Sequence, residues 1–261
     1  MELNLANKTA LVLASSQGLG KAIATELVKE GTNVMISSRN PDKLKRVQDE
    51  LNGLKKGKVV FFPADLTKSE DINQLVKETR KTFGSIDILI NNAGGPPSGT
   101  FEEFSDEEWE HSFQLNLMSY IRTIREVLPD LKKTGGKIIN IASSSIKQPI
   151  SGLILSNTFR MGIVGLSKTL AEELGPYNIL INTVAPGKIA TDRITTLDEM
   201  TAKKQQVSVE EIAKTNQKAI PLGRYGTPEE FAKFVVFLVS DVNTYVTGSA
   251  IIIDGGSVKA I

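Results

Sequence analysis

The chain has 261 residues, a net charge of +1 and 40% hydrophobic residues. This length and apolar content allow one large domain with a sizeable core. The near-neutral charge gives no sign of a nucleic-acid or membrane surface. The absence of cysteine excludes disulfides, thiolate metal sites and a cysteine nucleophile. A single histidine, His111, excludes any site that needs two, and we expect it to be an exposed helix residue.

The expected location of the protein follows from the sequence features that are missing. The first residues show no basic region followed by an apolar core, as a secretory leader would. No apolar run approaches the ~20 residues that span a bilayer. We therefore expect a soluble, cytoplasmic protein without a metal site.

Short apolar runs rich in β-branched residues recur along the chain. Most are near-continuous rather than alternating, which is typical of strands buried on both faces. Segments long enough for a crossover helix separate most of them. The expected strands are residues 9–14, 34–36, 59–62, 86–90, 137–141, 179–184 and 250–253.

Helical patterns lie between these runs. Leu19, Ile23 and Leu27 are spaced four apart within residues 18–29, which places them on one helix face. Strands that alternate with helices predict an α/β fold with a doubly wound parallel sheet, the Rossmann fold, as a single domain over residues 1–261. Further helices are expected at residues 41–54, after Ser69 and at 228–239.

One polar stretch, at about residues 188–220, interrupts the alternation. A long insertion after the carboxyl end of a strand often covers a ligand. We interpret it as a substrate lid, with a plain surface helix as the alternative.

The first expected strand leads into Ala14-Ser15-Ser16-Gln17-Gly18-Leu19-Gly20 and then a helix. Glycines at this point allow the backbone to approach a pyrophosphate, whose charge is stabilised by the helix N-terminus. The pattern alone is weak, but its position after the first strand of a βαβ unit strengthens it. An ordinary tight turn is the alternative.

Ser38 and Arg39 follow the second expected strand, where an NAD site commonly has an acidic residue for the ribose 2′-hydroxyl. None is present, and an arginine suits a 2′-phosphate through charge-assisted hydrogen bonds. We therefore favour NADP(H) over NAD(H). Otherwise Arg39 is a solvated loop cation.

Further motifs follow the later strands in a fixed order. They are Asp65-Leu66, Asn91-Asn92-Ala93-Gly94, Leu115-Asn116-Leu117, Ser143, Pro186-Gly187 with Thr191, and Thr247-Gly248 with Asp254-Gly255-Gly256. Over about residues 8–256 the chain resembles the short-chain dehydrogenases/reductases, most closely the 3-oxoacyl-acyl-carrier-protein reductase-like members. The resemblance implies hydride transfer between a nicotinamide and a carbonyl or alcohol carbon.

Two departures from the family pattern stand out. Leu13-Ala14 replaces the Thr-Gly that opens the family's glycine-rich turn, which adds a methyl group near the pyrophosphate path. Counted from Ser143, the family's catalytic tyrosine and lysine positions fall on Ser156 and Arg160. The chain is therefore expected to lack the Tyr-x-x-x-Lys motif.

The resemblance assigns roles to residues of this chain. It implies catalytic roles for Asn116, Ser143, Ser156 and Arg160. It implies cofactor contacts from Ala14, Ser15, Ser16, Gln17, Gly18, Leu19, Gly20, Ser38, Arg39, Asp65, Leu66, Asn92, Ala93, Gly94, Arg160, Pro186, Gly187, Ile189 and Thr191.

Without the tyrosine, the proton needs another source. A tyrosine with an unperturbed pKa of ~10 can be made acidic enough by a neighbouring lysine, whereas a serine cannot. Arginine, with a pKa above ~12, is a poor proton donor but a permanent cation. The remedies are a water that delivers the proton, a second tyrosine such as Tyr120, or a desolvated Lys147 or Lys188.

Three functions remain open on sequence. The first is an NADP(H)-dependent oxidoreductase acting on a carbonyl, alcohol or activated alkene. The second is a sensor that binds the cofactor without turnover. The third is a non-redox lyase like the halohydrin dehalogenases, which resemble the family and carry arginine in place of the lysine. Members of the family are commonly homo-oligomers, so a tetramer or dimer is expected.

Overall fold

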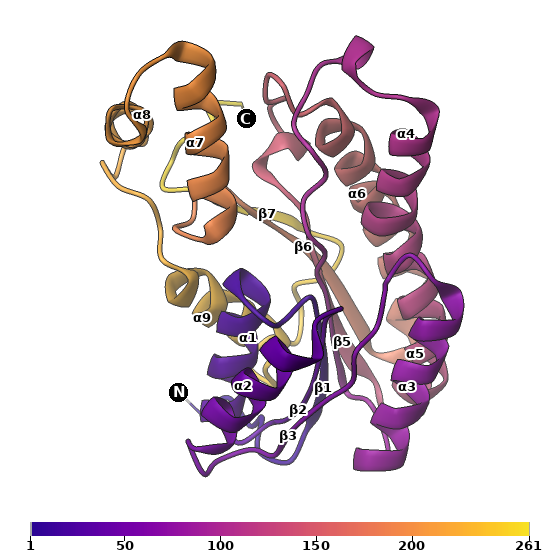
Figure 1. The fold of residues 1–261 in the computed structure, drawn as a ribbon. Coiled ribbons are helices and arrows are strands. Elements are labelled where there is room, and N and C mark those ends of the chain that lie inside the picture. The colour runs from indigo at the N-terminus through magenta and orange to yellow at the C-terminus, as the bar shows by residue number, and fades with distance from the viewer. Residues whose placement is uncertain (1, 261) are drawn as a thin grey trace.

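The computed structural model describes residues 2–260. Its centre is a parallel sheet in the order β3-β2-β1-β4-β5-β6-β7 (Figure 1). The order reverses between β1 and β4, which creates a crevice at the carboxyl ends of these two strands. The strands are β1 (Thr9–Leu13), β2 (Asn33–Ser37), β3 (Val59–Phe61), β4 (Ile88–Asn91), β5 (Gly136–Ile141), β6 (Ile179–Pro186) and β7 (Ala250–Ile253).

Helices cover both faces of the sheet, as the strand–helix alternation predicts (Figure 1). One face carries α1 (Gly18–Lys29), α2 (Pro41–Asn52) and α9 (Pro228–Val239). The other carries α3 (Ser69–Phe83), α5 (Ser119–Thr134) and α6 (Ile154–Leu174). The doubly wound fold is confirmed.

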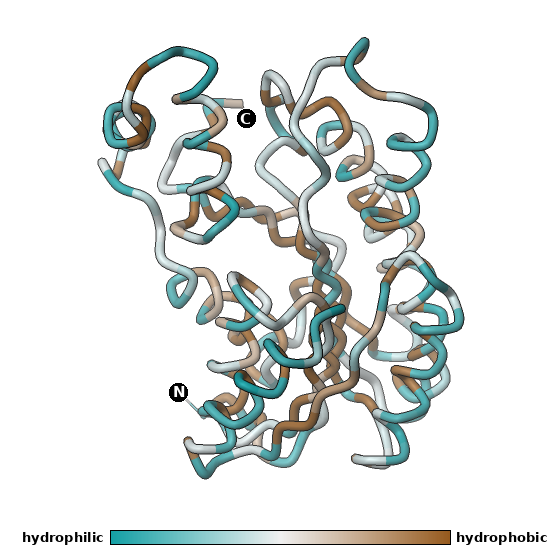
Figure 2. The backbone as a smooth tube through the Cα atoms, viewed as in Figure 1, coloured by the Kyte–Doolittle hydropathy of each residue, from teal (hydrophilic) through white to brown (hydrophobic). Residues whose placement is uncertain are grey.

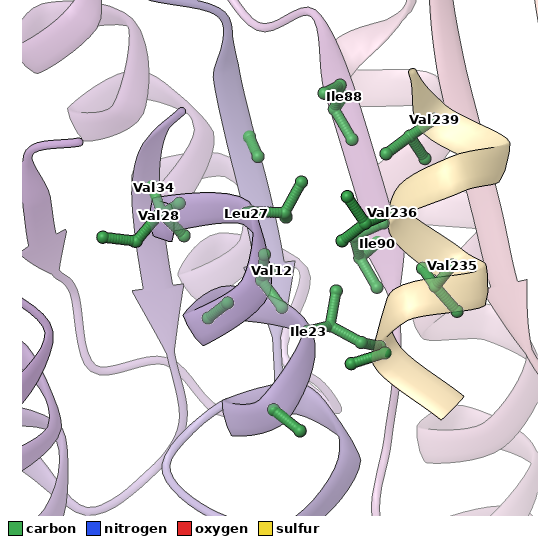
Figure 3. Packing of buried hydrophobic residues seen from close by; sticks show 14 of the residues in the cluster. Val12, Ile23, Leu27, Val28, Val34, Ile88, Ile90, Val235, Val236 and Val239 are labelled. Carbon is green, nitrogen blue, oxygen red and sulfur yellow. The ribbon is translucent and has the colours of Figure 1, made fainter. Parts of the chain in front are cut away.

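Successive side chains of a strand point to opposite sides, and the central strands bury both sets. Val12 packs with Ile23 and Leu27 of α1, and with Val235 of α9 (Figure 3). Its neighbour Leu11 belongs to the core on the other face. The hydrophobic colour in Figure 2 accordingly follows the central strands, whereas the outer turns of the helices are polar.

The first two helices begin at the residues that the sequence predicts. The N-terminus of α2 is capped by Asn40, whose side chain accepts a hydrogen bond from the amide of Lys43 at 2.9 Å. The last two residues of the predicted 41–54 segment lie outside the helix, which ends at Asn52. Such differences at helix ends are expected, because the terminal turns have few partners.

The remaining helices gather beyond the carboxyl edge of the sheet. Residues 188–220 contain α7 (Asp192–Gln205) and α8 (Val209–Lys218), which stand together at the upper left of Figure 1. Across from them, α4 (Asp106–Phe113) continues through a π-helical turn, Gln114–Met118, into α5. Short 3-10 turns occur at Phe101–Glu103, Ser144–Ile146 and Gly175–Tyr177. Within residues 2–260, no helix combines the length and apolar character needed to cross a membrane.

Candidate active site

A cavity of about 1520 Å³ lies at the carboxyl edge of the sheet. Its wall is made by the segments that follow β1, β2, β3, β4, β5 and β6, and by α7. Ligand pockets of drug-sized molecules are typically ~300–1,000 Å³, so this cavity can hold more than one such molecule. The position is where open α/β sheets bind their ligands.

The β1–α1 turn is shaped by its backbone. Gly18 has a φ of +56°, a conformation that glycine adopts without steric cost. A Cβ on Gly20 would lie 2.4 Å from the carbonyl oxygen of Ala14, so this position accepts no side chain. Ala14 itself has a φ of +47°, which is strained for a residue with a Cβ. Asn92 secures the turn by donating from Nδ2 to the Ala14 carbonyl at 3.3 Å.

Ser15 lies behind this turn rather than on the cavity wall. Its side chain is fully buried, donates to the carbonyl of Val12 at 2.7 Å and accepts from the amide of Ser37 at 3.0 Å. Ser15 therefore ties the ends of β1 and β2 together. Gly20 is also absent from the lining, so both residues act on the turn from behind.

Positive charge gathers at the end of the cavity next to β2. Arg39 and Lys43 both line it, and Lys43 donates to the side chain of Gln17 at 2.9 Å. Partial burial would raise the pKa of Asp65, but hydrogen bonds from Thr67 and the charges of Lys68 and Arg39 hold that pKa below its usual value. Asp65 is therefore ionised at neutral pH. Lys43 was not predicted from sequence, although it lies only one helical turn beyond Arg39.

Ser38 supplies an unusual group on the same wall. Its hydroxyl oxygen is buried and has no hydrogen-bond partner within residues 2–260. Most buried polar groups are hydrogen-bonded, so this hydroxyl is an exception, as are those of Ser37, Ser112 and Ser145.

A buried polar network fixes α6 against the sheet. Asn140 of β5 accepts from Asn91 of β4 at 2.8 Å and donates to Ser167 of α6 at 2.9 Å. Thr183 of β6 donates to the same Ser167 hydroxyl at 2.9 Å. Because these bonds are satisfied inside the core, they set the position of the helix that carries Ser156 and Arg160.

Ser143 and Ser156 both line the cavity. Ser143 follows β5, and its hydroxyl accepts from the amide of Ser145 at 3.2 Å. Ser156 lies in the first turn of α6 and is only 6% exposed. The structure thus brings these two predicted hydroxyls into one site.

Arg160 is 4% exposed and is among the residues that line the cavity. Its Nη1 donates to the hydroxyl of Tyr120 and to the carbonyl of Ile141, each at 2.9 Å. Its Nε has no partner among the described residues. Arg160 therefore links α6 to α5 and to the end of β5 in addition to any role in the cavity.

Tyr120 cannot serve as the substitute proton donor that the sequence allowed. It is fully buried, does not line the cavity and donates its hydroxyl proton to the carbonyl of Ile141 at 2.8 Å. Burial raises the pKa of Tyr120 despite the nearby charge of Arg160. No tyrosine lines the cavity within residues 2–260.

Asn116 lies in the π-helical turn between α4 and α5 and is fully buried. It is not part of the cavity lining, and neither polar atom of its side-chain amide bonds to another described group. Turns of this kind occur often at functional positions. Its implied catalytic role stays a prediction.

The segment after β6 closes the cavity near the β1–α1 turn. Thr191 approaches Gly18, with its Cγ2 3.8 Å from where a Cβ would stand. Lys188 is half-buried on the wall, and burial lowers its pKa, an effect only partly offset by the charge of Asp198. The alternative lysine, Lys147, is exposed and does not line the cavity.

The α7 helix adds two features that the sequence did not reveal. Asp198 is 6% exposed and accepts from Asn216 of α8 at 2.7 Å and from the hydroxyl of Tyr225 at 2.7 Å, which anchors α7. Desolvation and this hydrogen bond raise the pKa of Tyr225 to about 12. Arg193 lies on the cavity wall and donates to the carbonyl of Pro96 at 2.7 Å.

Most residues that the sequence assigned to the site line this one cavity, and Ser15, Gly20 and Asn116 lie behind its wall. His111 is exposed, as expected, and lines the cavity as well. The predicted residues on the wall are Ala14, Ser16, Gln17, Gly18, Leu19, Ser38, Arg39, Asp65, Leu66, Asn92, Ala93, Gly94, Ser143, Ser156, Arg160, Pro186, Gly187, Ile189 and Thr191. No group of three or more acidic or histidine side chains in the described part of the chain could hold a metal ion.

Known proteins are similar to this chain in sequence and in fold. The family described as enoyl-(acyl carrier protein) reductase matches residues 13–258. The 3-oxoacyl-[acyl-carrier-protein] reductase FabG of Aquifex aeolicus is 36% identical over 98% of this chain and 99% of its own. The NADPH-dependent reductase BacG of Bacillus subtilis is 31% identical over 98% and 100%. The structure of L-sorbose reductase from Gluconobacter frateurii, complexed with NADPH and L-sorbose, matches with a TM-score of 0.95 and 32% identity over 100% of both chains. The chain therefore belongs to the short-chain dehydrogenase/reductase family of oxidoreductases.

Proposed function

We propose that this protein is an NADP(H)-dependent oxidoreductase that acts on a carbonyl, alcohol or activated-alkene substrate through an atypical Ser/Arg site. The observation that carries the proposal is the continuous cavity. It joins a glycine-shaped turn at one end to Ser143 and Ser156 further along. NADPH is named for BacG and for the sorbose reductase structure, which supports the same cofactor here.

The residues fit a dinucleotide phosphate. The backbone of Ala14–Gly20 lies at the N-terminus of α1, where a pyrophosphate is stabilised. Arg39 and Lys43 line the cavity next to β2 and would bind the 2′-phosphate. A nicotinamide supplies or accepts the hydride. Pro186–Thr191 would hold it on the wall next to Gly18.

The proton chemistry depends on what lines the cavity around Ser143. The hydroxyls of Ser143 and Ser156 can donate hydrogen bonds to an oxygen on which negative charge develops. Lys188 is the lysine on this wall whose pKa burial lowers. We assign the proton donation to Lys188, directly or through one water.

The test is a titration of the purified protein with NADPH and with NADH, followed by a panel of ketones, aldehydes and enones. We expect NADPH to bind more tightly than NADH, and at least one compound to oxidise it. Failure of both nucleotides to bind the folded protein would refute the proposal.

A second candidate is a cofactor-binding sensor without turnover. It is favoured by one observation, that no phenolic side chain of the described residues lines the cavity. Tight NADPH binding with no hydride transfer across the panel would support the sensor and exclude the oxidoreductase.

We also propose a homo-oligomer. Phe101 is 71% exposed and Met161 49% exposed. Phe101 stacks edge-on against Trp109, which in turn meets Phe159, so an aromatic surface spans α4 and α6. Light scattering during size exclusion tests the assembly, and a monomer at micromolar concentration would exclude it.

A further inference from the structure

Two arginines from different helices line this cavity, and the charge of one acts on the other. Arg160 comes from α6 and Arg193 from the first turn of α7, and both line the wall. They are close enough that the charge of Arg160 adds to burial in lowering the pKa of Arg193. Like charges held together in a partly buried place are unfavourable unless something compensates them.

The protein supplies only neutral partners for this pair. Arg193 donates to the carbonyl of Pro96 and Arg160 to the carbonyl of Ile141 and the hydroxyl of Tyr120. Neither arginine forms an ion pair within residues 2–260. A guanidinium has five N–H donors, so each retains donors beyond those used here.

None of the acidic residues Asp198, Glu103 and Asp192 forms an ion pair with either arginine. Asp198 accepts from Asn216 and Tyr225, and its charge acts on Lys188. Glu103 accepts from the amide and the hydroxyl of Thr100 in a helix cap. Asp192 is exposed at the start of α7 and makes no ion pair with its neighbour Arg193.

The loop after β4 is built around Arg193. A Cβ on Gly95 would lie 3.2 Å from three atoms of the guanidinium, so glycine allows the arginine to pass closely. Pro96 presents the carbonyl that holds it. The stretch Gly94–Gly99 is rich in glycine and proline, and its backbone accommodates the side chain of Arg193.

We propose that Arg193 and Arg160 bind a carboxylate of the substrate, which makes this enzyme a reductase of oxo acids or unsaturated acids. Planar guanidinium groups bind a carboxylate through paired, charge-assisted hydrogen bonds. Ile150, Leu153, Leu197 and Met200 line the same cavity and would contact an apolar body. The identification of the bound carboxylate as part of a substrate rests on the proposed oxidoreductase function. The binding of an anion at this site can be tested separately.

The experiment is calorimetry with matched probes that cannot react. Benzoate and 3-phenylpropanoate are compared with benzamide and 3-phenylpropanamide, with and without saturating NADP⁺, in low-salt buffer. We expect each carboxylate to bind at least tenfold more tightly than its amide. Arg193→Gln should remove that preference and leave NADP⁺ affinity within twofold. Lys204→Gln, which removes a cation from the same cavity wall near Glu103, should keep the preference.

The remaining outcomes are decisive as well. Equal binding of acid and amide, or an unchanged preference in Arg193→Gln, overturns the carboxylate site. A loss of NADP⁺ affinity of tenfold or more in Arg193→Gln, together with inorganic phosphate binding that NADP⁺ displaces, assigns the arginine to the cofactor and also overturns it. If NADP⁺ does not bind, the proposed function fails, and the measurements without nucleotide still decide the anion site.

Discussion

The β1–α1 turn and the first turns of α6 contribute to the same cavity, but they follow the family pattern unequally. The turn keeps its shape through backbone conformation, with Gly18 at positive φ and no room for a Cβ at Gly20. The helix acts through side chains, and there Ser156 and Arg160 stand at the positions expected for tyrosine and lysine. The half of the cavity built from backbone thus keeps the expected geometry, whereas the half built from side chains presents different residues.

The largest effect is expected where the chemistry changed. Lys188→Met should lower the rate of carbonyl reduction by about 10²-fold or more, as expected for loss of a general acid. Under this proposal, reduction by the unmodified enzyme requires protonated Lys188. The rate should therefore fall as pH rises through its pKa, which burial places below the usual 10.5. Rates from pH 6 to 10 measure both effects.

The matched control for this variant is Lys147→Met, at an exposed lysine that does not line the cavity. It should leave both the rate and the pH profile unchanged. A Lys188→Met enzyme that keeps the descending limb at high pH would remove Lys188 as the proton donor and leave water bound by the two serines.

The second prediction addresses the backbone-built half. In Gly20→Ala the new methyl group would lie 2.4 Å from the Ala14 oxygen and 2.9 Å from Asn92 Nδ2. We expect the free energy of unfolding to fall by about 1–3 kcal/mol, the usual cost of overpacking. NADPH affinity should weaken by tenfold or more because the turn must shift. Denaturant unfolding and fluorescence titration measure the two.

Gly165→Ala serves as the control, since Gly165 lies within α6 with nothing within 4 Å of the added Cβ. That variant should be neutral or more stable by up to about 1 kcal/mol. If Gly20→Ala keeps the NADPH affinity and the free energy of unfolding of the unmodified protein, the shape of the β1–α1 turn does not depend on the absence of a Cβ at position 20.

The sequence predicted the backbone-built half better than the side-chain half, for a physical reason. Strands buried on both faces give continuous apolar runs, and glycines mark the turn, so both are visible locally. Arg193 was missed because an arginine on a polar helix resembles any solvated cation. Its one local signal was the Gly95-Pro96 loop that makes room for it. Tyr120 donates its hydroxyl proton to the carbonyl of Ile141. This hydrogen bond depends on packing between distant segments, which no local sequence pattern reveals.

A smaller effect is expected at the end of the cavity next to β2, for a substitution that changes the preference for NADPH over NADH. Arg39→Ser should weaken NADPH binding by about tenfold or more, because a hydrogen bond to a charged group contributes about 1.5–3 kcal/mol. NADH affinity should stay within twofold, since NADH lacks the 2′-phosphate. Arg46→Ser, within α2 and outside the cavity lining, should change neither. If Arg39→Ser weakens the binding of NADPH and of NADH equally, Arg39 does not bind the 2′-phosphate.

The smallest expected effect tests the one departure within the backbone-built half. Ala14 adopts a φ of +47°, where a Cβ costs about 1–2 kcal/mol. Ala14→Gly removes this strain but adds about 0.4–1 kcal/mol of conformational freedom to the unfolded chain. The net gain in the free energy of unfolding should be about 1 kcal/mol or less, or ~2–4 °C in Tm.

Lys55→Gly, at a φ of +54° and outside the cavity lining, should give a similar gain. If only Ala14→Gly also tightens NADPH binding, the alanine methyl lies in the path of the pyrophosphate. If Ala14→Gly destabilises the protein, contacts of that methyl outweigh the strain, and the alanine belongs to the architecture of the turn.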